Sequence, residues 1–168
     1  MFTNCSDKIV QEDIKKAARL AERYFHTKTD SSQLRTNVSN FSWVYHNFHE
    51  CLNILKDGEE VICVTLILPC TLVKMNDFLS GKTNERELFK SIKEKADYNN
   101  FESIYLCLAC VKPKYRKQGL ALKSFVDSIK HICRGRKVKL FFWAFSEEGR
   151  RLCTKVAMDV GMEVRCRS

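Results

Sequence analysis

The sequence predicts a mixed α/β domain built around one twisted β-sheet. Asp57-Gly58 lies between the apolar runs CLNILK and EEVICVTLIL, a pattern typical of a β-hairpin. Residues 101–111 are almost wholly apolar from Ile104, as in a strand buried on both faces. The remaining segments alternate helical and strand periodicity, and a length of 168 residues fits a single domain over 1–168.

The N-terminal segment predicts one helix followed by a polar connection. Apolar residues recur at helical spacing from Asp7 to Phe25, and Ser6 is a suitable N-cap. Residues 27–40 are polar and favour a loop, with or without a helical turn. Residues 41–49 are rich in aromatic side chains, and their pattern leaves helix and strand both open.

The middle of the chain predicts the hairpin, two helices and the central strand. The second strand of the hairpin is expected to end at Pro69, which has no amide hydrogen to donate. Residues 71–79 and 84–96 show helical patterns, and the second begins with a polar cap and acidic side chains. About thirty residues therefore separate the hairpin from the strand over 101–111.

The C-terminal third predicts a helix, a strand, a helix and a strand. The first helix is expected from Arg116 to about Cys133, where Arg134-Gly135 closes it. Residues 137–145 read KVKLFFWAF and favour a strand. Ser146 is a suitable cap for a last helix that ends at Gly161, and residues 162–166 form a short final strand.

Composition and charge limit the kind of protein. Apolar residues make up 45% of the chain, as in ordinary globular domains, and the apolar run over 61–68 is too short to cross a bilayer. The N-terminus has no signal-peptide pattern, so we expect a cytoplasmic protein without membrane association. The net charge of +9 favours anionic partners, but its spread along the chain makes nucleic acid an unfavoured partner.

The candidate metal ligands of the chain are nine cysteines and one His/Glu cluster. Without an export signal, the cysteines are expected to be reduced. Cys107 and Cys110 form a CxxC, but strand alternation points them to opposite faces, which argues against a shared metal or redox site. The segment HNFHE over 46–50 could bind metal if helical, line a substrate cleft, or form a solvated face; we predict no metal.

The segment VKPKYRKQGLAL over 111–122 predicts an anion site at a strand-to-helix junction. Pro113 ends strand pairing, and the first amides of the following helix have no partner within the helix. The helix dipole favours negative charge at this end, and Gly119 leaves the backbone open to a ligand. Walker and dinucleotide-binding fingerprints are absent from the sequence. The alternative interpretation is a basic helix cap with no ligand.

The residues Arg116-Lys117-Gln118-Gly119-Leu120-Ala121 resemble the R/Q-x-x-G-x-G/A signature of the GNAT superfamily of N-acetyltransferases, in its bacterial-type members. The preceding apolar strand, the Val-x-Pro-x-Tyr-Arg step and the apolar helix that follows resemble the family as well. The resemblance covers most of residues 50–165. It implies a mixed, mostly antiparallel central sheet flanked by helices, and the helical segment at about 69–100 would be an insertion.

What the resemblance implies is an acetyl-CoA-dependent N-acetyltransferase, in which an amine attacks the thioester directly. Backbone groups of the central strand would pair with the pantetheine arm, the signature amides would hold the pyrophosphate, and Ser146 would lie beside the pantetheine. The acceptor would be a small-molecule or protein amine. The implied cofactor-binding residues are Ala109, Cys110, Val111, Arg116, Lys117, Gln118, Gly119, Leu120, Ala121, Leu122 and Ser146.

The sequence departs from the family at its proton-handling positions. Tyr105 stands where some members carry a glutamate base, and Ala157 stands where many carry a tyrosine acid. Tyr105 could face the cleft as a catalytic donor, by parity with Cys107 and Ala109, or pack in the core. The insertion could cover the acceptor site, form the contact of a homodimer, or be a surface elaboration.

Two further functions stay open at this point. The missing proton handlers are compatible with a domain that binds acyl-CoA and acts as a sensor or regulator without turnover. The net charge of +9 is compatible with a nucleic-acid-associated protein.

Overall fold

The computed structural model describes residues 2–4, 10–94 and 99–168. Six strands form one sheet in the order β1-β2-β3-β4-β5-β6. The first three neighbouring pairs are antiparallel and the last two are parallel, so the predicted mixed, mostly antiparallel sheet is confirmed. The strands are β1 (Phe2–Asn4), β2 (Leu52–Asp57), β3 (Glu60–Cys70), β4 (Ser103–Val111), β5 (Lys139–Trp143) and β6 (Val164–Arg167).

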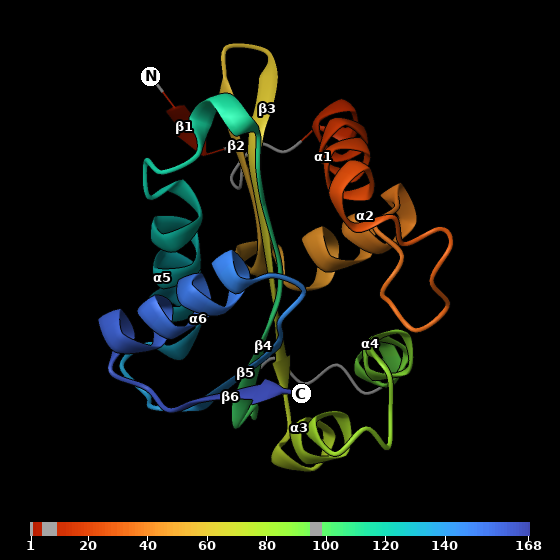
Figure 1. The fold of residues 1–168 in the computed structure, drawn as a ribbon, viewed down its shortest axis with the longest axis vertical. Coiled ribbons are helices and arrows are strands. Elements are labelled where there is room, and N and C mark those ends of the chain that lie inside the picture. Colours follow the sequence, from red (N-terminus) through yellow and green to blue (C-terminus); the bar gives the residue numbers. More distant parts are fainter. Residues whose placement is uncertain (1, 5–9, 95–98) are drawn as a thin grey trace.

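Helices cover both faces of this sheet (Figure 1). The helices α5 and α6 lie on one face, α1 and α2 lie on the other, and α3 and α4 lie toward the end of the sheet where β6 is found. The helices are α1 (Gln11–Phe25), α2 (Val38–Asn47), α3 (Leu72–Leu79), α4 (Glu85–Glu94), α5 (Leu120–Cys133) and α6 (Glu147–Val160), with the short 3-10 helices η1 (His49–Cys51) and η2 (Pro113–Tyr115). No helix in the described parts of the chain is long and apolar enough to span a membrane.

The N-terminal elements refine the sequence prediction. Val10 has an extended backbone and precedes α1, so the helix begins later than the predicted Asp7. Ser6, the predicted N-cap, lies outside the described residues. The ambiguous segment after residue 40 is helical, and its helix α2 begins at Val38 because the Asn37 side chain accepts a hydrogen bond from the amide of Asn40.

The hairpin is confirmed, and its second strand is longer than predicted. Gly58 adopts a φ of 58° in the turn, which explains the glycine there. However, β3 does not end at Pro69; it continues to Cys70, and Pro69 pairs with Ile104. On its other side, β3 pairs with β2 only as far as Leu66, which lies opposite Leu52. Pro69 lies beyond this point, so no described strand on the β2 side needs a hydrogen bond from the amide that proline lacks.

A β-bulge in β4 overturns the predicted alternation of Cys107 and Cys110. Leu106 pairs with Ile67 and Leu108 pairs with Leu66, so Cys107 is an extra residue in β4. The Cys110 thiol lies 3.6 Å from the carbonyl of Leu20 on α1, and the Cys107 thiol lies 3.7 Å from Glu85 Oε1 on α4. Both sulfurs therefore face the same set of helices, because the bulge shifts the side-chain parity between them.

The same bulge overturns the predicted parity of Tyr105, Cys107 and Ala109. Tyr105 and Cys107 both contact Glu85, whereas Ala109 packs with the small apolar cluster formed by Ile62, Cys63, Tyr115 and Ala121. Ala109 therefore does not share a side of the sheet with Tyr105.

The insertion between β3 and β4 is helical, as predicted, and it belongs to the core. Its helices α3 and α4 bury Met75, Phe78, Leu88, Phe89 and Ile92. The Phe78 ring is fully buried against Tyr105 of β4 and Phe141 of β5. The predicted extension of the second helix to residue 96 lies outside the described residues.

Candidate functional site

The paired region of β4 and β5 is much shorter than β4 itself. The parallel register runs over Ser103–Lys139, Ile104–Leu140 and Tyr105–Phe141, while β4 continues to Val111. Beyond Tyr105, the side of β4 that faces β5 therefore has no strand partner among the described residues. An unpaired strand edge presents backbone amides and carbonyls that an extended ligand can bind. We call this stretch of β4 the open edge.

Backbone alternation identifies which residues present their groups at the open edge. The amide of Lys112 donates to the carbonyl of Ile62 at 2.9 Å, so residue 112 bonds toward β3. Because bonding direction alternates along an antiparallel strand, Cys110 also bonds toward β3, while Ala109 and Val111 face the open edge. The Val111 carbonyl already accepts a bond of 3.0 Å from Arg116 Nε.

The junction after β4 is held against the hairpin by Tyr115. Its ring packs with Ile62 and Cys63, and its hydroxyl donates to Asp57 Oδ2 at 2.7 Å. This hydrogen bond to Asp57 is the main reason that the pKa of Tyr115 is raised to about 12. The backbone that leads from the open edge into α5 therefore has a defined position.

The helix after the junction begins at Leu120, not at the predicted Arg116. Lys117 has a φ of 62° and Gly119 has a φ of 74°, so both residues are left-handed and outside the α-helical region. Such backbone is rare for a lysine and stores local strain, which is typical of functional loops. Gly119 takes the N-cap position, and no side chain caps α5.

A row of backbone amides at this junction has no acceptor. In the described structure, hydrogen-bond acceptors are found for the amides of Tyr115, Arg116 and Lys123, and the hydrogen-bonded turn over 116–117 closes on the amide of Gln118, but none is found for the amides of Lys117 and of residues 119–122. Alternating left- and right-handed backbone turns successive amides toward one concavity, and the helix dipole adds positive potential. The predicted signature residues Lys117, Gln118, Gly119, Leu120, Ala121 and Leu122 are thus brought together by their backbone.

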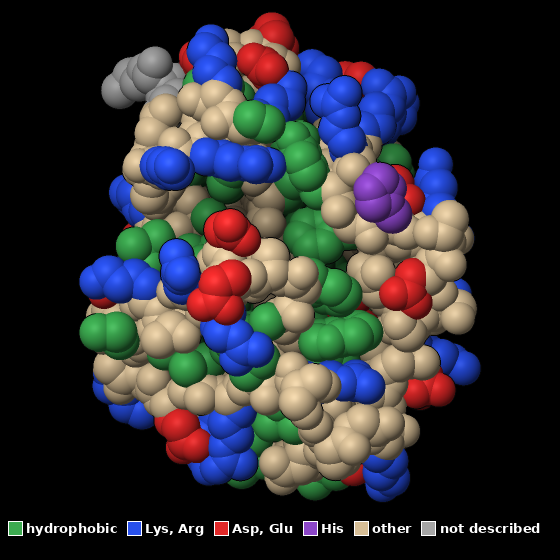
Figure 2. Space-filling model, viewed as in Figure 1, with side chains coloured by type: hydrophobic (Ala, Val, Ile, Leu, Met, Phe, Trp, Pro, Cys, Tyr) green, Lys and Arg blue, Asp and Glu red, His purple; other side chains and the backbone are tan. Residues whose placement is uncertain are grey.

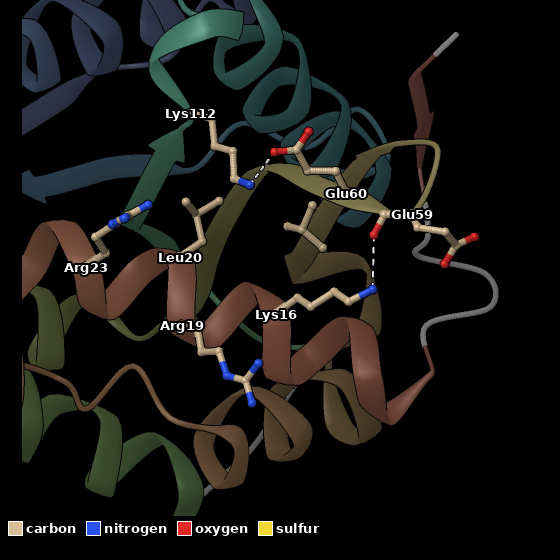
Figure 3. Close-up of a pocket in the computed structure, with 8 residues that line it drawn as sticks. Lys16, Arg19, Leu20, Arg23, Glu59, Glu60 and Lys112 are labelled. Carbon is tan, nitrogen blue, oxygen red and sulfur yellow. Dashed lines mark hydrogen bonds and ion pairs between the residues drawn. The ribbon is translucent and has the colours of Figure 1, made fainter.

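Several basic side chains lie near the junction. The Arg116 guanidinium lies 5.3 Å from the Tyr24 ring on α1, and its Nε donates to the Val111 carbonyl. A groove of about 390 Å³ between α1 and the hairpin is lined by Lys16, Arg19, Arg23 and Lys112, with Glu59 and Glu60 (Figure 3). Lys112 pairs with Glu60 at 2.5 Å, whereas Arg19 and Arg23 have no acidic partner among the described residues. Lys and Arg gather near this end of the molecule in Figure 2.

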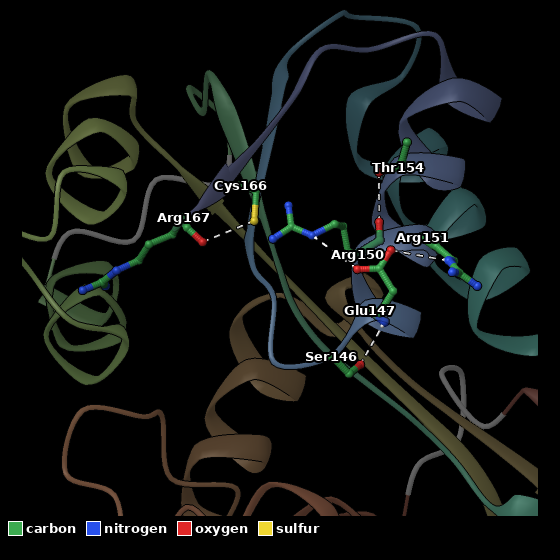
Figure 4. A network of polar contacts seen from close by, with 8 residues as sticks. Ser146, Glu147, Arg150, Arg151, Thr154, Cys166 and Arg167 are labelled. Atoms are coloured by element: carbon green, nitrogen blue, oxygen red, sulfur yellow. Dashed lines mark hydrogen bonds and ion pairs between the residues drawn. The ribbon is translucent and has the colours of Figure 1, made fainter.

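Ser146 caps α6, which occupies its hydroxyl oxygen. Its Oγ accepts a bond of 3.0 Å from the amide of Gly149 (Figure 4). Glu147 in the same first turn forms ion pairs with Arg150 and Arg151. The structure therefore assigns Ser146 a capping position, and the cofactor contact implied by the resemblance stays a prediction.

We expect Ser146→Ala to lower the free energy of unfolding by about 1 kcal/mol, because the amide of Gly149 loses its acceptor. Ser146→Asp is the matched control, since aspartate caps as well as serine but has no hydroxyl to donate. Urea denaturation measures the stability of both variants. If Ser146→Asp, which keeps the cap, shows a smaller rise of melting temperature with acetyl-CoA than the wild type does, Ser146 contacts the cofactor in addition to capping α6; equal rises in the wild type and Ser146→Asp contradict that contact.

Tyr105 lies in the core, where it contacts a buried carboxylate. Its ring is fully buried and stacks on Phe141 at 5.0 Å, and its hydroxyl donates to Glu85 Oε1 at 2.7 Å. Glu85 Oε2 accepts a bond of 2.6 Å from the amide of Leu34. Burial is the main cause that raises the pKa of the Glu85 carboxyl, and the hydrogen bonds oppose it. In sequence, Glu85 was only an acidic residue in the first turn of a helix, so no local pattern pointed to it.

A small pocket adjoins this carboxylate on the α1 side of β4. It is lined by the end of α1, the segment between α1 and α2, the bulge in β4 and the end of β5; these residues are Phe25, Thr27, Gln33, Leu34, Thr36, Leu66, Glu85, Cys107, Leu108 and Phe145. The segment between the helices is held by Glu22, whose carboxylate accepts bonds from Thr27, Lys28 and Thr36. We call this the Glu85 pocket.

The remaining clusters do not form a recognisable metal site. Glu50 lies 3.4 Å from the Nδ1 of His49 and 3.5 Å from the Nε2 of His131. Within the described ranges, no three His, Cys, Asp or Glu side chains are placed to hold one metal ion.

The sequence was also compared with known proteins. It matches no model of a protein family, and it matches no curated protein. The open edge, the amide row and the Glu85 pocket are therefore interpreted on their geometry and on the motif alone.

Proposed function

We propose that this protein is an N-acetyltransferase with a GNAT-like fold that uses acetyl-CoA as acyl donor and an amine as acceptor. The observation that carries the proposal is the open edge of β4 next to the row of free amides over 119–122. An extended chain that ends in a pyrophosphate matches both features in order: amide groups along the chain for the strand edge, and phosphate oxygens for the helix start.

The residues present fit the donor through their backbone. The carbonyl and amide of Ala109 and the amide of Val111 are directed to the open edge, so they can bond the pantetheine amides. The amides of 119–122 would hold the pyrophosphate, and the small side chains of Gly119 and Ala121 allow close approach. Acetyl-CoA would supply an activated acyl group as a thioester. The Val111 or Ala109 amide would stabilise negative charge on the acyl oxygen.

Thermal stability of the whole chain with acetyl-CoA tests this proposal directly. A ligand that binds only the folded state stabilises it by about 2.7 kcal/mol at a hundredfold excess over its Kd. We therefore expect acetyl-CoA to raise the melting temperature, and acetate with ADP in place of acetyl-CoA to raise it less, because the strand edge is then unfilled. No rise at millimolar acetyl-CoA would exclude the site.

A second candidate is a non-catalytic acyl-CoA sensor. The burial of Tyr105, with its hydroxyl bonded to Glu85, favours it, because this side chain is not free to act at the open edge. Release of the CoA thiol separates the two functions. Release that depends on a primary amine indicates the transferase, whereas stabilisation by acetyl-CoA without release indicates the sensor.

A further inference from the structure

Glu85 is unusual because its carboxylate is buried without a cation. Two acidic side chains are buried in the described structure, Asp13 and Glu85. Asp13 forms an ion pair of 3.1 Å with Lys56, whereas no Lys, Arg or His of the described residues forms an ion pair with Glu85, which is only 5% exposed. A buried carboxylate without a counter-ion is costly to keep charged. A protein that retains one has reason to bring a cation or a proton to it.

The Glu85 carboxylate is held rigidly at the wall of the pocket. The Tyr105 hydroxyl fixes Oε1 and the Leu34 amide fixes Oε2, while the Cys107 thiol lies 3.7 Å from Oε1. These three donors come from β4 and from the segment before α2. A carboxylate can accept about four hydrogen bonds, so one acceptor direction is left for a ligand.

The pocket in front of Glu85 has a volume of about 10 Å³, which is room for one water-sized group such as an ammonium head. Its walls include Phe25, Leu108 and Phe145, and the two phenylalanine rings meet edge to face at 6.2 Å. Aromatic faces and a carboxylate together favour an organic cation. Phe145 is 48% exposed, so the pocket reaches the surface beside this ring. In Figure 2 apolar side chains run along the middle of this side of the molecule.

The pocket also adjoins the proposed donor site. Cys107 lies in the bulge just beyond the last β4–β5 pair, Tyr105–Phe141, and it lines the pocket together with Leu108. The open edge begins at the same point, and Ala109 is the next residue of β4. The carboxylate is therefore next to the start of the open edge.

We propose that Glu85 binds the ammonium group of the acceptor in this pocket and takes its proton, and that the acceptor is a primary amine whose chain stays outside the pocket, beside the exposed Phe145. This inference rests on the proposed function. The inserted helix α4 would then supply the base that β4 lacks at Tyr105, and Tyr105 would be a positioning residue that orients the carboxylate.

The proton balance of the step is complete without further reactants. The bound ammonium gives one proton to the Glu85 carboxylate and becomes a neutral amine. Its nitrogen forms a bond to the acyl carbon as the bond from carbon to sulfur breaks, and the nitrogen loses a second proton while the leaving sulfur gains one. Glu85 then returns its proton to water, so the products are the amide, the CoA thiol and one proton.

Binding of a small amine tests the ammonium site without acetyl-CoA. We use n-butylamine, which is an ammonium ion at pH 7.5, and n-butanol as its neutral counterpart, with protein-observed NMR titration of the whole chain. The wild type is expected to bind the ammonium at least tenfold more tightly than the alcohol. Glu85→Gln is expected to lose this preference and keep the fold, since glutamine can still pair with Tyr105 and Leu34.

Glu87→Gln is the matched control for charge. Glu87 lies on the same helix, is exposed, and accepts a bond from the amide of Asn84. This variant removes one carboxylate from α4 outside the pocket, so it should keep the preference for the ammonium ion. Absence of that preference in the wild type, or its persistence in Glu85→Gln, would overturn the inference.

Kinetics test the proton transfer itself. With n-butylamine and acetyl-CoA, thiol release is expected to fall about 10²–10⁴-fold in Glu85→Gln, which is the usual size of a general-base effect. The rate should rise with pH as the Glu85 carboxyl ionises. When 2,2,2-trifluoroethylamine, a much weaker base, replaces n-butylamine, the apparent pKa of this rise should not shift with the pKa of the amine. Tyr105 and Cys107 bond the Glu85 carboxylate, and the charge of Asp30 acts on it. Arg86, the next residue of α4, donates to the carbonyls of Gln33 and Asp30 beside the pocket.

The variant Tyr105→Phe distinguishes a catalytic base at Glu85 from a carboxylate with only a structural role. The Tyr105 hydrogen bond lowers the pKa of Glu85, so its loss should move the rising limb of the pH profile to higher pH. A purely structural carboxylate would leave the limb unchanged. If the wild type turns over and Glu85→Gln keeps the same rate and the same pH profile, Glu85 is not the base, while the proposed function still holds. If acetyl-CoA does not bind the wild type, the proposed function itself fails.

Discussion

Gly119→Glu is expected to abolish the stabilisation of the protein by acetyl-CoA. The substitution places a carboxylate among the free amides of 119–122, where it repels the pyrophosphate and can occupy the amides itself. A Cβ at this position meets no atom within 4 Å, so no clash with the protein is created. The φ of 74° adds a strain of about 1–2 kcal/mol for a residue with a side chain. The melting temperature with and without acetyl-CoA measures the loss.

Gly135→Glu is a control matched in all but position. Gly135 lies just beyond the other end of α5, has a φ of 85°, and a Cβ there also meets no atom within 4 Å. Both variants therefore carry the same added charge and similar backbone strain, but only Gly119 adjoins the amide row. Equal shifts of melting temperature with acetyl-CoA in the wild type and in a folded Gly119→Glu protein would refute the placement of the site.

Phe78→Ala is expected to lower the free energy of unfolding by about 3–5 kcal/mol, as for other fully buried aromatic side chains. The ring is 0% exposed and lies 5.0 Å from the Tyr105 ring and 5.9 Å from the Phe141 ring. The Arg167 guanidinium lies 4.6 Å from the other side of the ring, so the variant also loses this contact with β6. Urea denaturation followed by tryptophan fluorescence measures the effect.

Val73→Ala tests whether the effect comes from burial. Val73 is on the same helix α3, but it is 70% exposed, so its truncation should change the stability by at most about 0.5 kcal/mol. A loss below about 1 kcal/mol in Phe78→Ala would mean that the segment between β3 and β4 is an appendage and not part of the core. The position of Glu85 would then also be in doubt, because α4 follows α3 in this segment.

Local signals predicted a large part of the fold. The Asp57-Gly58 turn, the cap at Ser146 and the stop at Gly161 act over a few residues, so the sequence carries them directly. The start of α5 was predicted four residues early, because a run of polar residues does not reveal left-handed backbone at Lys117 and Gly119. The strand over 103–111 was recognised from its apolar run, but a run cannot show the bulge at Cys107.

One part of the candidate site was also predicted from the sequence, and another part was not. The segment over 116–122 was found from its motif, whereas Glu85 was missed because its partners Leu34, Tyr105 and Cys107 are far from it in sequence. The role of Cys110 also changed, since only the pairing of β4 with β3 shows that its backbone faces away from the open edge.

By itself, the sequence determined the α/β class, the order of the elements from β2 onward, and the glycine and capping residues that end several of them, because hydrophobic periodicity and caps are short-range properties. It did not predict β1, and it left α2 open between helix and strand. The tertiary structure decided where β4 separates from β5, which backbone groups face that gap, and which carboxylate lies beside it. These features depend on strand register and helix packing between residues up to 51 positions apart, as for Glu85 and Leu34. No local pattern encodes such contacts, because they form only when the inserted helix packs against the sheet.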